Sequence, residues 1–205
     1  LKLDAVPLHD IPIPFFPNIT HLEVGRINHS NLNEILRNTP NLTHLRLGTD
    51  YGQFDFQWEW KVAPAANSGV KYFIMEERGG AIGHEYQVID DNKHPDALRG
   101  PKWQTAAFYD VFPANNRVLQ PVGSFNESRV RVKSQLAEHW LNGIMVLNYT
   151  LGSQQLQDAV SKSKFKRVDR FGYRHQGHIL LQDHSDEVHY RNLKIKRLGK
   201  GKKKK

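Results

Sequence analysis

Acid–base and hydrogen-bonding side chains alternate with apolar ones near the end of the chain, over residues 171–198. In the string HILLQDH, Gln182 and His184 share one face of a strand and Ile179 lies on the other, because side chains alternate along a strand. Histidine exchanges protons near neutral pH, and glutamine both donates and accepts hydrogen bonds. We therefore predict that Gln182 and His184 belong to a catalytic or binding site. For His178 we expect a structural role.

A carboxylate lies on a second alternating strand, GHEYQVID. If Tyr86 and Val88 are buried, Glu85 and Gln87 face outward, again because side chains alternate. Glu85 is then a candidate general base, and Gln87 is a candidate substrate-binding residue. The alternative is an ordinary solvated strand face, which antiparallel sheets commonly have.

Two further candidates flank the Asn-Ser-Gly turn at residues 67–69. Lys71 follows this turn, and we expect it to be the cationic group nearest the site; the alternative is a solvated lysine. Asn67 begins the turn, and we count it among the substrate-binding candidates. Together with Glu85 and His184, Lys71 completes the predicted catalytic set.

The string EHWLNG offers an aromatic platform. Glu138 and Trp140 share one face of this strand, and His139 lies on the other. Trp140 can stack on a pyranose ring or can belong to the core, with even support for each. His139 is interpreted either as a binding residue or as a core histidine.

Arg191 can bind a carboxylate or a pair of hydroxyls in a bidentate manner, or it can form a structural salt bridge with Glu187 or Asp186. We count Arg191 among the substrate-binding candidates. Three loop carboxylates can hold a hard cation or can be solvated turn residues: Asp90, Asp91 and Asp96. The spacing of His and Glu shows no metal-binding motif, so the metal ligands are unknown and a divalent metal is only one of the options.

The charge and composition of the chain limit the classes of molecule that it is expected to bind. Of the 29 Lys and Arg residues, nine lie in residues 191–205, which contain no acid; this leaves 20 basic and 21 acidic groups elsewhere. The net charge of +8 therefore comes from the end of the chain. We expect residues 199–205 to be a disordered Lys-rich tail. We expect no specific nucleic-acid partner. Because no apolar run approaches about 20 residues, we expect no membrane span. The chain has no Cys, which excludes disulfides and thiolate metal sites.

From about residue 51 the chain alternates like a series of strands. FDFQWEWKV at 54–62 places four aromatic residues on one face, and Asn142–Gly143 suits a two-residue hairpin. Only residues 156–164 have a weak helical spacing. Many short strands separated by turns predict a mainly β fold, either a β-sandwich or a jelly roll.

The first 49 residues have a different sequence pattern. PNITHLEV at 17–24 and PNLTHLRL at 40–47 are nearly the same string at a period of 23, and their leucine spacing resembles leucine-rich repeats with a short helix between them. Chance similarity is the alternative. We predict a short α/β segment over 1–49 and a jelly-roll domain over 50–198. Because a missing opening strand exposes an edge of the sandwich, we expect residues 1–50 either to supply a makeshift strand or to leave the domain unstable.

Nine strings in order resemble the 3-keto-disaccharide hydrolase family across about residues 50–198: WEWKVAPAANSGVKYF, EYQVIDD, HPDAL, AFYDVFP, PVGSFNESRVRV, EHWLNG, SKFK, GHILLQDH and YRNLKIKRL. The chain departs from the family pattern at Phe125, Ser185 and His189, and the opening segment of the family is replaced by the repeat-like segment. The resemblance implies a concanavalin-like jelly roll in a secreted or periplasmic protein.

The resemblance also implies a reaction. The family acts on glycosides whose 3-hydroxyl has been oxidised to a ketone, so that a base removes the C2 proton, the C1 substituent leaves and water adds. This implies Glu85 or His184 as the base, Lys71 or a metal as the electrophile, and Gln87, Gln182 and Arg191 as hydrogen-bonding residues. The competing hypothesis is a non-catalytic carbohydrate-binding jelly roll, because folds of this class host both functions. The sequence leaves the oligomeric state open.

Overall fold

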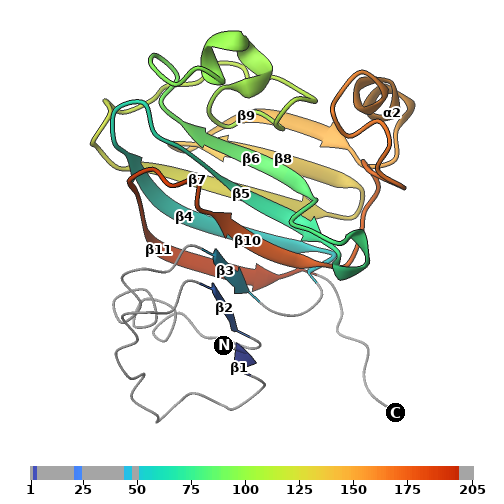
Figure 1. The fold of residues 1–205 in the computed structure, drawn as a ribbon. Helices are drawn as coiled ribbons and strands as arrows, with labels where there is room; N and C mark the ends of the chain where they lie inside the picture. Colours follow the sequence, from blue (N-terminus) through green and yellow to red (C-terminus); the bar gives the residue numbers. More distant parts are fainter. Residues whose placement is uncertain (1, 4–20, 25–43, 48–50, 199–205) are drawn as a thin grey trace.

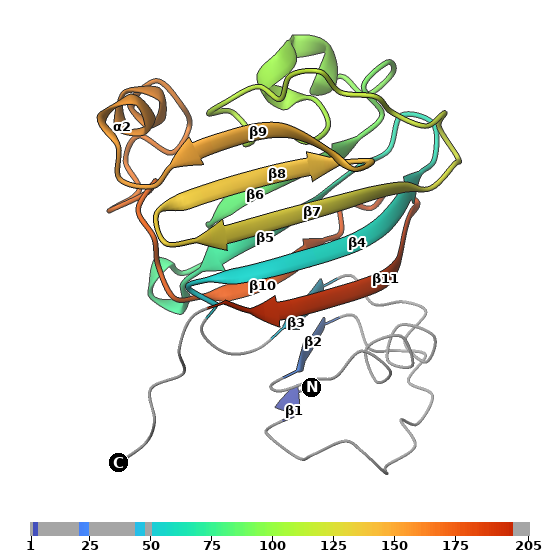
Figure 2. The same cartoon turned by 180° about the vertical axis from the view of Figure 1, so that it is seen from behind.

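The computed structural model describes residues 2–3, 21–24, 44–47 and 51–198, which form two sheets packed face to face (Figure 1). Within these residues, sheet A contains six strands in the order β1 (Lys2–Leu3), β2 (His21–Val24), β3 (His44–Leu47), β10 (His178–Gln182), β5 (Asn67–Ile74) and β6 (His84–Ile89). Sheet B contains five: β11 (Val188–Arg197), β4 (Phe54–Val62), β7 (Asn126–Lys133), β8 (Leu136–Leu141) and β9 (Ile144–Thr150) (Figure 2). This is the jelly-roll β-sandwich that the strand pattern predicts.

The side chains of β4 alternate between the two faces of sheet B, and those on the inner face form one layer of the core. Phe54, Phe56, Trp58 and Trp60 are at most 1% exposed, while the residues between them are half-buried. From sheet A, Tyr86 meets this layer, with its ring 5.1 Å from that of Trp58 in an edge-on arrangement. Burial of such large aromatic side chains supplies most of the driving force for closing a sandwich of this size.

Turn chemistry fixes the local connections. Asn142 and Gly143 both have positive φ, +48° and +80°, as a two-residue hairpin between β8 and β9 requires. The helical spacing corresponds to α2 (Gln154–Ser161), which begins earlier than predicted because the side chain of Ser153 caps it by accepting a hydrogen bond from the Leu156 amide. Three short 3-10 helices complete the described elements: η1 (Glu76–Arg78), η2 (Ala97–Arg99) and η3 (Pro101–Trp103).

Sheet A extends onto the N-terminal segment. β3 pairs antiparallel with β10, so residues 1–50 supply a strand, which is the first of the two outcomes that we expected for this segment. β2 pairs parallel with β3, and His21 lies opposite His44, so the register equals the 23-residue period of the sequence. The assignment to leucine-rich repeats stays a prediction, and both the expected helix between the repeats and the tail at 199–205 lie outside the described residues.

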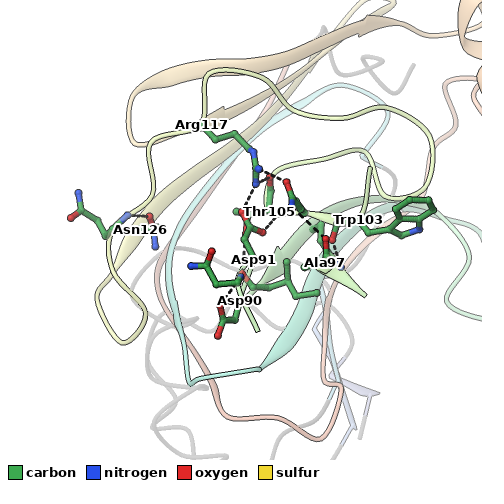
Figure 3. Close-up of polar contacts among 12 residues, drawn as sticks. Asp90, Asp91, Ala97, Trp103, Thr105, Arg117 and Asn126 are labelled. Atoms are coloured by element: carbon green, nitrogen blue, oxygen red, sulfur yellow. Dashed lines mark hydrogen bonds and ion pairs between the residues drawn. The ribbon is translucent and has the colours of Figure 1, made fainter. Parts of the chain in front are cut away.

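The long loop after β6 is fastened by its own carboxylates (Figure 3). Asp90 accepts hydrogen bonds from the backbone amides of Ala65 (2.8 Å) and Asn92 (3.0 Å). Asp91 accepts from the Thr105 amide at 2.7 Å and pairs with Arg117. These two carboxylates, which the sequence also offers as ligands for a hard cation, therefore hold the loop against the sandwich. None of the described helices is long and apolar enough to cross a membrane.

Candidate functional site

The candidate site lies on the outer face of sheet A, where β10, β5 and β6 are adjacent. Two cross-strand rows form it, one of Leu180, Lys71 and Glu85 and the next of Gln182, Gly69 and Gln87. Residues opposite one another on paired strands share a face of the sheet. Tyr86 and Val88 are buried on the inner face, so Glu85 and Gln87 lie on the outer face, as strand parity predicts. The register continues onto β3, where Arg46 lies opposite Leu180 and His44 lies opposite Gln182.

Gly69 makes room for the carboxylate of Glu85. A Cβ atom placed on Gly69 would lie 2.6 Å from Oε1 of Glu85, which is far inside van der Waals contact. The carboxylate thus leans across the neighbouring strand, over Gly69, the position in the adjacent row that has no side chain. Its other oxygen, Oε2, lies 3.7 Å from Nζ of Lys71. Glycine, carboxylate and ammonium together set the position of the candidate base.

The segment after η3 covers the outer edge of β6. The Ala106 amide donates to the Gln87 carbonyl (2.9 Å), and the Tyr109 amide donates to the Glu85 carbonyl (3.1 Å). This cover leaves Glu85 5% exposed and Gln87 1% exposed. A solvated strand face, the alternative considered above for this strand, does not describe such residues.

Burial raises the pKa of the Glu85 carboxyl above its usual value, since the charged form loses its water. The positive charges of Lys71, Lys164 and His184 oppose this rise without cancelling it. A carboxylate in such surroundings is a stronger base than one in water and is held ready for proton abstraction.

A second ammonium, that of Lys164, which was not among the predicted site residues, acts electrostatically on this carboxylate. Nζ of Lys164 is 4.1 Å from the ring centroid of Tyr109, whose hydroxyl donates to Oδ2 of Asp96 at 2.5 Å. The Lys164 amide donates to Oδ2 of Asp110 at 2.6 Å. Burial lowers the pKa of Lys164, and the nearby charges of Glu85 and Asp110 act in the opposite direction. The string SKFK, quoted above for the family resemblance, was the signal that could have drawn attention to Lys164.

Two buried amide oxygens offer hydrogen-bond acceptors at the site. Oε1 of Gln87 and Oε1 of Gln182 have no hydrogen-bond partner among the described residues. The amide nitrogen of Gln87 donates to the Trp103 carbonyl at 3.5 Å, which orients the side chain. A buried acceptor without a partner costs free energy, and a substrate hydroxyl can remove that cost. Both glutamines therefore suit substrate binding.

His184 and Asn67 lie at the border of the site. His184 is exposed two residues beyond the end of β10, and its charge lowers the pKa of Glu85. The Asn67 amide donates to Oδ2 of Asp186 at 2.9 Å, and the Ser68 hydroxyl donates to the Gln182 carbonyl at 2.5 Å. These bonds fasten the turn that carries His184 beside the start of β5.

Three predicted residues of β8 are not at this site. Glu138 and Trp140 lie on the outer face of sheet B, where Trp140 donates to Oε2 of Glu138 (3.4 Å) and stacks with the guanidinium of Arg129 (5.5 Å). His139 is 0% exposed in the core between the sheets, and its Nδ1 donates to the Ala106 carbonyl at 2.8 Å. Strand parity assigned these faces correctly but could not show which sheet they belong to.

Arg191 is likewise distant from Glu85, on the outer face of sheet B. Its Nε donates to Oε2 of Glu59 at 2.7 Å, and its guanidinium lies 3.5 Å from the ring centroid of Phe125. The structural alternative for Arg191 is therefore the observed one, with Glu59 as the partner instead of Glu187 or Asp186. The substitution at Phe125 that departs from the family pattern provides the ring for this contact.

Two hollows formed by described residues lie away from Glu85. A hollow of about 230 Å³ is lined by Trp60, Asp90 and Asn126 among others, and one of about 310 Å³ lies over sheet B beside Asp55 and Arg129. Neither hollow includes Glu85. We place the site at Glu85 because buried titratable groups with shifted pKa values converge there, which is a stronger sign of chemistry than an open hollow.

Metal ligands do not gather among the described side chains. Within this part of the chain, no three His, Asp or Glu residues are close enough together to hold a metal ion. Around Glu85 the charged neighbours are Lys71, Lys164 and His184, so that one imidazole and two ammonium groups accompany the carboxylate, and ammonium groups are not metal ligands. The described residues thus do not fit the metal option.

Comparisons with known proteins agree on one family. The model of the 3-keto-alpha-glucoside-1,2-lyase-like domain matches residues 23–196. A curated relative from Bacteroides thetaiotaomicron, a 3-keto-disaccharide hydrolase, is 32% identical over 171 residues; the match covers 71% of this chain and 59% of the relative. This chain therefore spans about three-fifths of that relative. The family match begins at residue 23, so it includes β3 and much of the segment that we predicted as repeats.

Solved structures show the same fold. A protein of Parabacteroides distasonis that is inferred to be a glycosyl hydrolase has a TM-score of 0.67 and 29% identity, with 73% of this chain and 72% of that chain covered. A second inferred glycosyl hydrolase of the same organism has a TM-score of 0.62, with 76% and 83% covered, and at 23% identity it supports the fold alone.

Proposed function

This chain belongs to the family of 3-keto-alpha-glucoside-1,2-lyase-like domains, and on that premise we propose that it cleaves 3-keto-glycosides by elimination and hydration. The observation that carries the proposal is the buried carboxylate of Glu85, whose pKa is raised by burial and which forms an ion pair with Lys71. The family names support a carbohydrate hydrolase, and the site chemistry leads us to the finer reaction. The resemblance is also the support for a secreted or periplasmic location, which stays a prediction.

The proposed reaction needs a base at C2. A ketone at C3 acidifies the hydrogen on C2, so a carboxylate can remove it. The electron pair forms the C1–C2 double bond, and the bond between C1 and the glycosidic oxygen breaks. Water then adds to C1 and a proton returns to C2, so that the net result is hydrolysis. This route differs from that of glycosidases in which two carboxylates flank the scissile bond.

We assign the roles by position. Glu85 is the base, and Lys71, whose Nζ is 3.7 Å from the Glu85 carboxylate, stabilises the negative charge that develops on the C3 oxygen. Gln87 and Gln182 bind sugar hydroxyls through their unpaired amide oxygens. Asn67 and His184 line the entrance from the turn side.

The carbohydrate-binding alternative has less support. Three of the predicted sugar-binding residues are Trp140, Gln87 and Arg191, but Trp140 and Arg191 lie on sheet B while Gln87 lies on the outer face of sheet A. A sugar cannot contact both outer faces of a sandwich at once. The grouping that remains, at Glu85, contains a base and cations, which a site that only binds sugar does not require.

The experiment that tests the proposal is incubation of the protein with 3-keto-glycosides, with and without chelator. We expect release of the aglycone and of 3-keto-glucose at the same rate in both conditions, because Glu85 and Lys71 supply the chemistry. Chromatography of the products measures both. Binding of the glycosides without any release would contradict the proposal, and loss of release in chelator would show that a metal takes the role we assign to Lys71.

Gly69→Ala is expected to lower kcat about 10- to 100-fold while the chain stays folded, since the new Cβ displaces the Glu85 carboxylate from its place. Gly80→Ala is the matched control, because a Cβ there meets only Ile82 at 4.0 Å. Steady-state kinetics with 3-keto-glycosides and circular dichroism measure the two effects. Equal kcat for the two variants would argue against the assigned position of the base.

A further inference from the structure

Lys164 is held at the candidate site by a rigid backbone. The segment that follows α2 turns back at Ser163, whose buried hydroxyl donates to the Val160 carbonyl at 2.8 Å and accepts from the Phe165 amide at 3.1 Å. The ring of Phe165 stacks on that of Phe171, with centroids 4.2 Å apart and planes 8° apart. Because the Lys164 backbone amide donates to Asp110, each residue from 163 to 165 is held by a hydrogen bond or a ring contact. The backbone of a lysine with an incidental surface role needs no such anchoring.

The side chain of Lys164 reaches over the residues that cover Glu85. Its ammonium lies 4.1 Å from the ring centroid of Tyr109 and 5.0 Å from that of Phe165. Tyr109 is in turn bonded through its amide to the Glu85 carbonyl. Although Lys164 as a whole is exposed, its ammonium is partly desolvated between two rings and faces the charges of Glu85 and Lys71.

Lys71 and Lys164 therefore both act electrostatically on the carboxylate of Glu85, from different elements of the fold. Lys71 is a neighbour of Glu85 on the adjacent strand and forms an ion pair with it at the floor of the site. Lys164 approaches from the rim, with its ammonium over the ring of Tyr109. An elimination requires two partners at opposite ends of the reacting bonds, a base for the C2 hydrogen and an acid for the departing oxygen. The rim position suits the acid, because the aglycone must leave toward solvent.

We propose that Lys164 is the general acid of the reaction and donates a proton to the glycosidic oxygen as the C1–O bond breaks. This inference rests on the proposed function. In the elimination, Glu85 gains the C2 proton and Lys164 becomes a neutral amine. In the hydration, the neutral amine removes a proton from the water that attacks C1, and Glu85 returns its proton to C2. Both groups end in their starting states. The lowered pKa of Lys164, caused by burial, agrees with a lysine that gives up a proton readily.

Leaving-group dependence tests this role. Wild type and Lys164→Met are compared on methyl 3-keto-α-glucoside, whose alkoxide must be protonated, and on p-nitrophenyl 3-keto-α-glucoside, whose phenolate leaves without a proton. We expect kcat/KM of the variant to fall about 10²- to 10⁴-fold on the methyl substrate and less than about 10-fold on the nitrophenyl substrate. Lys166→Met, an exposed lysine of the same segment, is the control and should match wild type on both.

Each outcome decides the inference. An equal loss on both substrates would place Lys164 at the enolate or in the fold, and an unchanged rate on the methyl substrate would remove it from the reaction; either result overturns the proposal. If Lys164→Met does not fold, Lys164→Arg keeps the charge without a proton to release and should show the same selective loss on the methyl substrate. A wild-type protein that cleaves neither substrate would instead overturn the proposed function itself.

Discussion

Glu85→Gln is expected to lower turnover of 3-keto-glycosides by about 10²- to 10⁴-fold while leaving the melting temperature unchanged or raised. The amide keeps the shape of the side chain over Gly69 but cannot accept the C2 proton. Burial raises the pKa of Glu85. At a pH above the ordinary pKa of a glutamate, the charged carboxylate therefore lowers the free energy of unfolding. Gln removes that cost, which offsets the loss of the ion pair with Lys71.

Kinetics with a 3-keto-glycoside and a thermal melt at pH 7 measure the two effects. Glu127→Gln, an exposed carboxylate on β7, is the control and should leave both unchanged. In wild type we also expect kcat/KM to fall on the acid side at a higher pH than an ordinary glutamate would give, because the base must be charged. A Glu85→Gln variant with wild-type turnover would remove Glu85 from the reaction.

The sequence predicted the part of the site that depends on alternation within strands. Tyr86 and Val88 predicted the outward position of Glu85 and Gln87, and Ile179 predicted that of Gln182, because a strand with one buried face leaves no choice for the other. What alternation does not contain is the identity of the sheet. Trp140, for which the sequence left a surface and a core position open, faces outward from sheet B, and a sandwich has two outer faces.

The rest of the site depends on contacts between distant segments. Lys164 reaches Tyr109 across 55 positions of chain, and no periodic pattern links them. The predicted turn at residues 67–69 is wrong, because Asn67, Ser68 and Gly69 pair with β6 as the start of β5. The importance of Gly69 comes from the carboxylate on that adjacent strand. The 23-residue period did contain structural information, since it equals the register of β2 on β3. Nothing in the repeat itself predicted that β3 would also pair with β10.

Acidification is expected to destabilise this protein through the histidines of its core. His139 is 0% exposed, its Nδ1 donates to the Ala106 carbonyl and its Nε2 accepts from the Tyr72 hydroxyl at 2.8 Å. Burial lowers the pKa of His139 from 6.5 to about 4, and it lowers that of His84 in the same direction. Between pH 6.5 and 4 the unfolded chain binds a proton at position 139 that the folded chain does not, so the free energy of unfolding falls as the pH falls.

The expected size follows from the shift at His139. At pH 5 the loss from this residue is about 2 kcal/mol, since each pKa unit is worth about 1.4 kcal/mol. Urea unfolding at pH 7.5 and pH 5.0 measures it. His139→Gln lowers stability at both pH values by disturbing the hydrogen bonds, but its loss between them should be smaller than that of wild type by about 2 kcal/mol. His184→Gln, which changes an exposed histidine, should keep the wild-type loss. If His139→Gln and wild type lose the same free energy of unfolding on acidification, the neutral core histidine does not set the acid limit of the fold.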